Sequence, residues 1–189
     1  MKYAIIPAAG SGTRMKELGR NYAKTVLPYE GKPILIHIIE NLEKAISPDE
    51  IIVVYSNYDH LEQLQDVVKF YGKQVTFTKV FKARANDREG PALSILSGIP
   101  EYVSHQDSLY IHLSDFVASV GAISLITPDS IATFPVEDQS RWCMVDSQFN
   151  LYDKPKIRVN YAQAVAGLYH LSDARTFKDV GFACQGLVS

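Results

Sequence analysis

The chain has 189 residues, with 19 Lys or Arg against 21 Asp or Glu, and 47% of it is hydrophobic. That composition is typical of a soluble globular domain and excludes a disordered tail, a collagen-like repeat and a coiled coil. The formal net charge of −2 gives no basic surface for nucleic acid or an acidic membrane. No apolar run reaches the ~18 residues of a membrane span. We therefore expect a cytoplasmic protein with one domain, residues 1–189, that binds neither nucleic acid nor membrane.

The first 115 residues alternate apolar runs of strand length with segments whose apolar residues recur at helical spacing. Strands are predicted at 2–6, 51–55, 75–81 and 109–113, and helices at 33–45, 61–71 and 91–99. This alternation is typical of an α/β fold, a Rossmann-like, doubly wound and mostly parallel sheet. Ligands of such sheets bind beyond the carboxyl ends of the strands. The site is therefore expected in the loops after Ile6, Tyr55, Phe81 and Leu113.

Beyond residue 115 the pattern changes, because short apolar runs are separated by turns rather than by helices. Strands are predicted at 131–136, 142–146, 151–159 and 162–171. Strands joined in this way favour antiparallel pairing. We therefore expect an antiparallel C-terminal part that belongs to the same domain.

A glycine-containing loop, residues 7–15, follows the first predicted strand and could bring backbone N–H groups close to an anion. A dinucleotide-binding loop would need a third glycine where Met15 stands. A Walker A loop would need a glycine immediately before Lys24, where Ala23 stands. The contiguous Gly10-Ser11-Gly12 is not the G-x-S-x-G of a nucleophile elbow. Dehydrogenase, P-loop NTPase and serine hydrolase are all disfavoured.

The loop and the residues after it resemble a family. Gly10-Ser11-Gly12-Thr13-Arg14, then Lys24, then Leu27-Pro28 and Gly31-Lys32-Pro33, is similar to the nucleotidyltransferases that make sugar nucleotides. Their pattern is G-x-G-T-R, a spacer, P-K, and L-P-x-x-G-K-P; here Ala23 stands where the pattern has the proline before lysine. The resemblance implies a GT-A-type version of the Rossmann-like fold. It also implies transfer of a nucleoside monophosphate, expected from CTP or UTP, to a sugar phosphate or small alcohol phosphate, with release of pyrophosphate.

Four later segments extend the resemblance. Glu89-Gly90-Pro91-Ala92 resembles the G-T-A segment that contacts the base, and Ser114-Asp115-Phe116 resembles the element that supplies a metal carboxylate. Asp153-Lys154-Pro155 resembles E-K-P, whose lysine meets the acceptor phosphate, and 165–169 resembles the N-A-G-I-Y strand. The Gly90-Pro91-Ala92 and Asp115-Phe116 pair is most similar to members linked to capsule and surface-polysaccharide pathways.

These matches imply a role for each candidate residue. A phosphate nucleophile is largely ionised at pH 7, so no general base is needed and catalysis must come from positioning and charge neutralisation. Arg14 would brace the β- and γ-phosphates, Lys24 would neutralise the α-phosphate, and Asp115 would bind Mg²⁺. Lys154 and Gly167 would bind the acceptor. The residues implied to bind the nucleotide are Ala8, Ala9, Gly10, Ser11, Gly12, Thr13, Glu89, Gly90 and Pro91.

Structural alternatives stand beside these roles. Arg14, Lys24 and Lys154 could be solvated surface cations, and Asp115 could cap a following helix. Gly90 could simply begin a helix, and Glu89 could complement the helix dipole. For His112, inside a predicted strand, we expect a core histidine rather than a ligand.

The chain also departs from the family. Its second metal carboxylate would lie beyond the segment ending at Tyr169, where eighteen residues follow Leu171 and Asp173 and Asp179 lie too close to Tyr169. The chain would then lack the family's C-terminal part, and either a one-metal site or a site shared within a homo-oligomer would be required. Two other functions stay open: a catalytically inactive nucleotide-binding regulatory module, and a GT-A-like glycosyltransferase, which would prefer a D-x-D where Asp115 stands alone.

Overall fold

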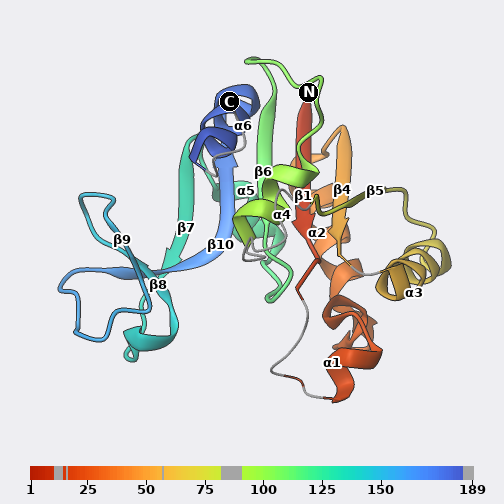
Figure 1. Ribbon diagram of the computed structural model, residues 1–189, viewed down its shortest axis with the longest axis horizontal. Helices are drawn as coiled ribbons and strands as arrows, with labels where there is room; N and C mark the ends of the chain where they lie inside the picture. The colour runs from red at the N-terminus through yellow and green to blue at the C-terminus, as the bar shows by residue number, and fades with distance from the viewer. Residues whose placement is uncertain (11–14, 16, 57, 82–90, 185–189) are drawn as a thin grey trace.

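The computed structural model describes residues 1–10, 15, 17–56, 58–81 and 91–184. Within these residues, one sheet of eight strands forms the body of the molecule (Figure 1). Its order is β5-β4-β1-β6-β10-β8-β9, with β7 also paired to β10. The strands are β1 (Lys2–Pro7), β4 (Glu50–Tyr55), β5 (Thr76–Lys79), β6 (Ser108–His112), β7 (Ser130–Phe134), β8 (Cys143–Val145), β9 (Leu151–Asp153) and β10 (Gln163–Leu171).

The strand directions divide the sheet into two parts. β1 lies parallel to β4 and to β6, and β4 lies parallel to β5. β10 is antiparallel to β6, and β7 and β8 are antiparallel to β10. The mostly parallel sheet with an antiparallel C-terminal part is therefore confirmed.

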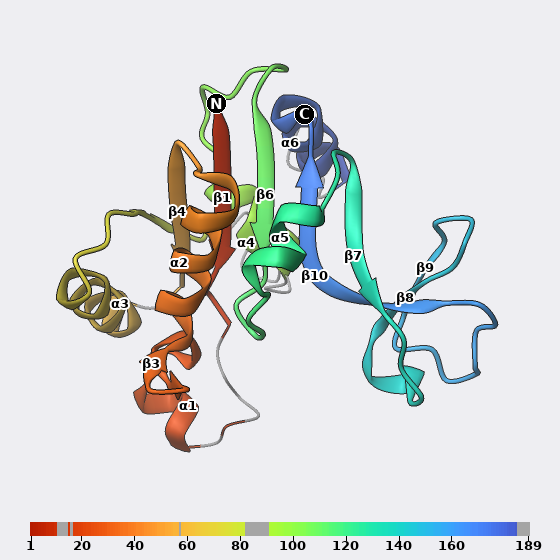
Figure 2. The same cartoon turned by 180° about the vertical axis from the view of Figure 1, so that it is seen from behind.

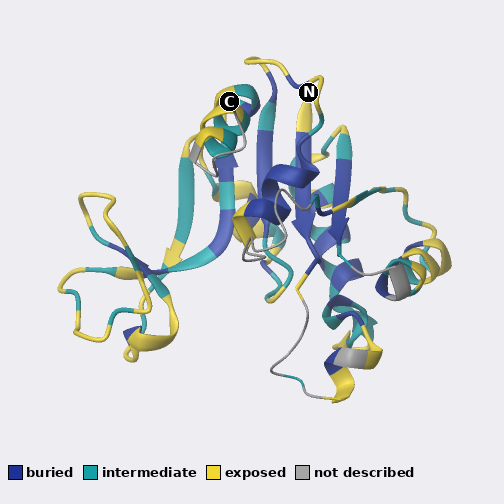
Figure 3. Cartoon of the chain, viewed as in Figure 1, coloured by how far each residue is buried: buried dark blue, intermediate teal, exposed yellow. Residues whose placement is uncertain are grey.

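Helices cover both faces of the sheet (Figures 1 and 2). Alternate residues of β1 point to opposite faces, so Ala4 and Ile6 belong to one apolar core while Tyr3 and Ile5 belong to the other. The first core receives α2 (Ile34–Ile46), α3 (Tyr58–Phe70) and α5 (Val120–Leu125); the second receives α4 (Pro91–Gly98) and α6 (Ala174–Cys184). The buried strands between these helices form the dark centre of Figure 3.

Helix α4 lies unusually close to the sheet, and Gly98 explains how. A Cβ atom built on Gly98 would lie 2.7 Å from Cγ2 of Ile5 and 2.7 Å from Cγ2 of Val54. Only glycine permits this approach without moving these side chains. The close packing holds the last turn of α4 against β1 and β4.

The structure adds elements that the sequence did not predict. They are α1 (Glu17–Asn21), the 3₁₀ turns η2 (Lys24–Val26) and η3 (Gln139–Arg141), the two-stranded hairpin β2 (Pro28–Tyr29) and β3 (Lys32–Pro33), and the helices α5 and α6. Both helices begin at side-chain caps: Ser119 Oγ accepts from Ala122 N at 3.2 Å, and an Asp173 carboxylate oxygen accepts from Thr176 N at 2.8 Å. The short polar residues before 120 and 174 were the signal that would have revealed them.

The predicted strand 151–159 was wrong in length. β9 ends at Asp153, because Lys154 has a left-handed backbone with φ 47° and Pro155 follows it. Strands β8 and β9 form an arm that projects from the body and joins it through the first half of β10 (Figure 1). Over the described part of the chain, helices are too short or too polar to cross a membrane.

Candidate functional site

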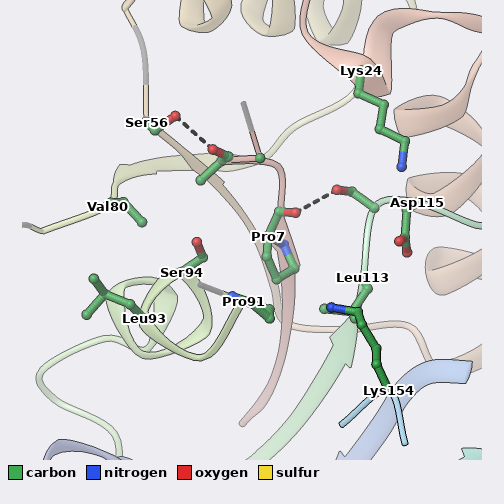
Figure 4. Close-up of a pocket in the computed structure, with 13 residues that line it drawn as sticks. Pro7, Lys24, Ser56, Val80, Pro91, Leu93, Ser94, Leu113, Asp115 and Lys154 are labelled. Atoms are coloured by element: carbon green, nitrogen blue, oxygen red, sulfur yellow. Dashed lines mark hydrogen bonds between the residues drawn. The ribbon is translucent and has the colours of Figure 1, made fainter. Parts of the chain in front are cut away.

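A cavity of about 430 Å³ opens at the carboxyl ends of the parallel strands (Figure 4). This is the edge of the sheet that the strand-end rule predicts. The size falls within the range typical of pockets for small molecules and cofactors. The described residues that line it are Pro7, Ala9, Gly10, Lys24, Ser56, Val80, Pro91, Leu93, Ser94, Leu113, Ser114, Asp115 and Lys154.

Two serine hydroxyls fix the loops around this cavity. Ser56, directly after β4, donates from Oγ to the carbonyl oxygen of Ala9 at 2.8 Å. Ser114, two residues after β6, donates from Oγ to the carbonyl oxygen of Pro7 at 2.6 Å. Both bonds are drawn in Figure 4. The loop after β1 is thus tied to its neighbours on both sides, which limits how far its backbone can move.

Lys24 reaches the cavity from outside the sheet. It is the first residue of the 3₁₀ turn η2, and the residues on either side, Ala23 and Thr25, are buried. Burial of these two neighbours turns the Lys24 side chain the other way, into the cavity (Figure 4). Within the described residues, no hydrogen bond or ion pair engages its ammonium group, so the charge is available to an anionic ligand.

Asp115 lies in the turn that follows β6, and it lines the same cavity as Lys24 (Figure 4). Its carboxylate has no hydrogen-bond or ion-pair partner in the described part of the chain. It is also the sole carboxylate among the described lining residues. Groups of three or more His, Cys, Asp or Glu side chains that could hold a metal ion are absent from the residues described.

The turn that carries Asp115 is organised by His112. The imidazole is fully buried, with Nδ1 2.8 Å from the carbonyl oxygen of Leu113 and Nε2 3.2 Å from the amide nitrogen of Ala118. The second contact requires Nε2 to accept, so the ring is neutral with its proton on Nδ1. Burial lowers the pKa of His112 to about 4, which keeps it in that form at neutral pH. The core role expected for His112 is therefore confirmed.

Lys154 lines the cavity from the projecting arm. Its left-handed backbone is anchored by the bond from Lys154 N to the carbonyl oxygen of Trp142, 3.0 Å long. Its ammonium lies 3.8 Å from the Asp153 carboxylate, and both side chains are largely exposed. Such a long, solvated pair is weak and leaves Lys154 able to bind an anion.

Gly167 lies behind the cavity wall rather than in it. Its carbonyl oxygen accepts from Leu113 N at 2.8 Å, and its φ is +80°. A Cβ atom there would lie 2.8 Å from Cδ1 of Leu113, a residue that lines the cavity. The structure thus gives Gly167 a packing reason to be glycine, while its predicted contact with an acceptor stays a prediction.

The cavity brings together six residues that sequence reasoning selected, and misses others. The six are Ala9, Gly10, Lys24, Pro91, Asp115 and Lys154. Ala8 is buried beside them, and its N–H donates to the Val54 carbonyl oxygen at 2.8 Å, so that N–H is not available to a ligand, while its predicted contact with the nucleotide stays a prediction. Ser11, Gly12, Thr13, Arg14, Glu89 and Gly90 lie outside the described residues. Sequence reasoning missed Ser56, although its position directly after a predicted strand was a usable signal.

Asp173 is at the wrong end of the sheet to serve as a second metal ligand. Because β10 runs antiparallel to β6, the end of β10 lies where β6 begins. Asp173 follows β10 and lies 3.1 Å from Nδ1 of His105, which precedes β6. Asp179 is in α6 beyond it and pairs with Arg175 at 2.9 Å. The expectation that neither residue supplies this ligand agrees with the geometry.

Comparison with known proteins assigns this chain to a family. A family model described as the MobA-like NTP transferase domain matches residues 4–127. The chain therefore belongs to the MobA-like NTP transferase domain family. The matched segment contains every described residue that lines the cavity except Lys154.

Several curated proteins are similar in sequence. The chain is 34% identical over 108 residues to the bifunctional enzyme IspD/IspF of Desulfotalea psychrophila, covering 57% of this chain and 25% of that protein. It is 28% identical over 177 residues to the bifunctional protein GlmU of Methanococcus maripaludis, covering 90% and 40%. It is 36% identical over 87 residues to the UTP–glucose-1-phosphate uridylyltransferase of Staphylococcus epidermidis, covering 42% and 30%. The chain thus matches less than half the length of each relative.

Solved structures share the fold. A Bacillus anthracis chain crystallised with sucrose superposes with a TM-score of 0.73 at 20% identity, covering 100% of this chain and 79% of that one. The UDP-glucose pyrophosphorylase of Acinetobacter baumanii superposes with a TM-score of 0.70 at 14% identity, covering 94% and 76%. At such identities the likeness establishes the fold alone.

Proposed function

We propose that this protein is a nucleotidyltransferase of the pyrophosphorylase type. It transfers a nucleoside monophosphate, from CTP or UTP, to a sugar phosphate or a small alcohol phosphate, and pyrophosphate leaves. The observation that carries the proposal is the juxtaposition of Lys24, Asp115 and Lys154 around one cavity at the strand ends. Membership of an NTP transferase family supports it, as does the similarity to a uridylyltransferase.

The reaction needs charge neutralisation more than proton transfer. An oxygen of the acceptor phosphate attacks the α-phosphorus, the bond from that phosphorus to the bridging oxygen breaks, and pyrophosphate carries away the electron pair. The attacking oxygen is already ionised at neutral pH, since the second pKa of a phosphate monoester is ~6. Lys24, whose ammonium has no partner among the described residues, would neutralise the α-phosphate as charge develops on it.

Lys154 would hold the acceptor phosphate on the opposite side from the incoming nucleotide. It lines the cavity from an arm outside the segment that the family model matches. The backbone at Ala9 and Gly10 would approach the triphosphate, since a Cβ built on Gly10 has nothing within 4 Å. This arrangement favours in-line attack, because nucleophile and leaving group are bound from different elements.

The donor set fits Mg²⁺. A protein site for Mg²⁺ often supplies only one or two carboxylates, and water and substrate phosphates complete the octahedron. Asp115 meets that requirement, because its carboxylate faces the cavity with no described partner. Bound there, Mg²⁺ would neutralise phosphate charge and help to orient the triphosphate.

The finer assignments belong to the same proposal. The motif pairs at Gly90-Pro91-Ala92 and Asp115-Phe116 support a place in the supply of sugar nucleotides for capsule or surface polysaccharide. The single lining carboxylate among the described residues supports either a one-metal site or a site completed within a homo-oligomer.

Two cores that share one sheet support treating residues 1–189 as one domain. A cytoplasmic location is proposed because nucleoside triphosphates are made there.

The test is pyrophosphate release from CTP or UTP, with Mg²⁺ and a panel of sugar phosphates and alcohol phosphates. Removing a group that neutralises transition-state charge typically costs about 10²–10³ in kcat, so Lys24→Ala and Asp115→Ala should each lose that much. Lys69→Ala and Asp66→Ala are matched controls on exposed positions of α3, where activity should stay at the wild-type level.

One result would replace the proposal by the regulatory alternative. Tight UTP or CTP binding with no pyrophosphate release from any acceptor would identify a binding module. Transfer of a sugar from a ready-made sugar nucleotide, without pyrophosphate, would identify a glycosyltransferase.

A further inference from the structure

We infer that Gln63, on α3, is a positioning residue for Lys24. Its side-chain amide bonds the backbone on both sides of Tyr22, immediately before the turn that carries the lysine. The inference rests on the proposed function, because it assigns Gln63 a share in the reaction through Lys24.

The contact uses both ends of the amide. Gln63 Nε2 donates to the carbonyl oxygen of Asn21 at 2.7 Å, and Gln63 Oε1 accepts from Ala23 N at 2.9 Å. The two hydrogen bonds join residues that are 42 and 40 positions apart in the sequence. Two bonds from one planar amide fix direction as well as distance, so we call this contact the Gln63 clamp.

The clamp is attached to the core. Leu64, the next residue of α3, is fully buried, and Val68 one turn later is buried in the same cluster. α3 therefore has little freedom to move with the segment that Gln63 holds. On the other side Ala23, also fully buried, is the residue whose amide the clamp engages. The rigid partner is the helix, and the positioned partner is the segment before Lys24.

The clamp determines how the turn of Lys24 begins. The Ala23 carbonyl oxygen accepts from Val26 N at 3.0 Å, which closes the first turn of η2. Ala23 thus has its N–H held by Gln63 and its carbonyl engaged in the turn. Lys24 follows directly. Its side chain has four carbons, so a small rotation of the backbone moves the ammonium group through a larger distance.

The backbone of Ala23 explains why a clamp is needed. Its φ is −60° and its ψ is 127°. A proline ring would impose that φ without help. Proline stands at this position in the pattern that the sequence resembles. Alanine leaves φ free, but it restores an N–H group, and Gln63 uses that N–H to hold the same conformation. Ring and clamp are therefore two alternative restraints on one dihedral angle.

The two restraints exclude each other. A proline at position 23 would place a ring carbon where the N–H points, against Gln63 Oε1 at its present distance of 2.9 Å. Ala23→Pro alone should therefore displace the Gln63 side chain and disturb the turn. Gln63→Ala alone should release φ of Ala23. Together they should fit, because the small alanine side chain leaves space for the ring.

The experiment is a double-mutant cycle in full-length protein, read by pyrophosphate release. Since misplacement by ~1 Å can cost about 100-fold in rate, Gln63→Ala should lower kcat about 10- to 100-fold while changing KM for UTP less than about threefold. Ala23→Pro should also lower kcat, and the double variant should recover at least about tenfold over Gln63→Ala. Gln65→Ala, an exposed position on the same helix, is the matched control and should match wild type.

A readout that needs no activity accompanies the cycle. Hydrogen exchange of the Ala23 amide, followed by NMR, should be slow in wild type and in Gln65→Ala, and markedly faster in Gln63→Ala. Gln63→Glu keeps the acceptor oxygen and loses the donor, so it should keep most of this protection. An Ala23 amide that exchanges at the open-chain rate in wild type would overturn the inference even if no variant folds well.

The outcomes separate the two proposals. If Lys24→Ala is as active as wild type, or if wild type releases no pyrophosphate, the proposed function fails and the share of Gln63 in it falls too. If Lys24→Ala is inactive but a folded Gln63→Ala keeps wild-type kcat, only the positioning role is overturned. A fall in kcat without rescue by Ala23→Pro also overturns it, since general destabilisation would explain that result.

Discussion

Replacing Gly167 by alanine tests the contact that links the antiparallel part of the sheet to the cavity wall. Two costs are expected. At φ +80° an L-residue is strained by about 1–2 kcal/mol. The new methyl group would also lie 2.8–3.0 Å from three side-chain carbons of Leu113, an overlap of the kind that costs about 1–3 kcal/mol. The free energy of unfolding should therefore fall by roughly 2–5 kcal/mol.

Two other glycines separate these costs. Gly72 has φ +63° and nothing within 4 Å of its built Cβ, so Gly72→Ala carries the strain alone. Gly121 in α5 has an ordinary φ and meets only Ser119 Oγ at 4.0 Å. Gly121→Ala carries neither cost and should leave stability unchanged or raise it by up to about 1 kcal/mol.

The assay is urea unfolding of the four proteins at pH 7, with pyrophosphate release measured on the same samples. Gly167→Ala should be less stable than Gly72→Ala by the overlap cost, and it should also lose activity because Leu113 lines the cavity. If Gly167→Ala and Gly72→Ala are destabilised equally, Leu113 does not press on Gly167 and the reasoning is refuted.

Two further predictions concern buried polar side chains. Because burial holds the pKa of His112 at about 4, against ~6.5 in the unfolded chain, only the unfolded state takes up this proton between those values. Stability should fall by roughly 3 kcal/mol as pH drops from about 6.5 to 4, and His112→Gln should lack that part of the slope in urea unfolding; equal slopes would contradict it. Gln139 is buried and bonds Val159 twice, Val159 N to Gln139 Oε1 at 2.7 Å and Gln139 Nε2 to the Val159 carbonyl oxygen at 3.0 Å. Gln139→Ala should cost about 1–3 kcal/mol and speed proteolysis of 154–159, whereas unchanged cleavage would show that the loop is held elsewhere.

The parallel part of the fold could be predicted because its local signals agree. The apolar run ending at Ile6 indicates a strand, and the helical spacing after Pro33 indicates a helix. The strand-end rule then locates the cavity. Asp115 could be selected because it follows a predicted strand at that edge, whereas Lys24 was selected by its place in the motif that the sequence resembles. The resemblance to a family gave them roles that spacing alone does not give.

The remaining features depend on contacts between distant residues. Gln63 is one glutamine among ordinary helix residues, and its importance appears only once α3 lies beside Ala23. The left-handed backbone of Lys154, which shortens β9, is held by Trp142 from the neighbouring strand end and has no local sequence signal. The caps of α5 and α6 could have been recognised from the sequence, but the residues around them also resemble turns.

The central place of β1 has a consequence for how the chain is made. β1 pairs on one edge with β4, which is complete at Tyr55, and on the other with β6, which is complete only at His112. At about 5–20 residues per second, synthesis of the intervening 112 − 55 = 57 residues takes about 3–11 s. During that interval one edge of this largely buried strand offers unpaired N–H and carbonyl groups to any neighbouring chain. The strand that later supports the cavity is thus open to aggregation while the chain is being made, and a chaperone would protect it in that window.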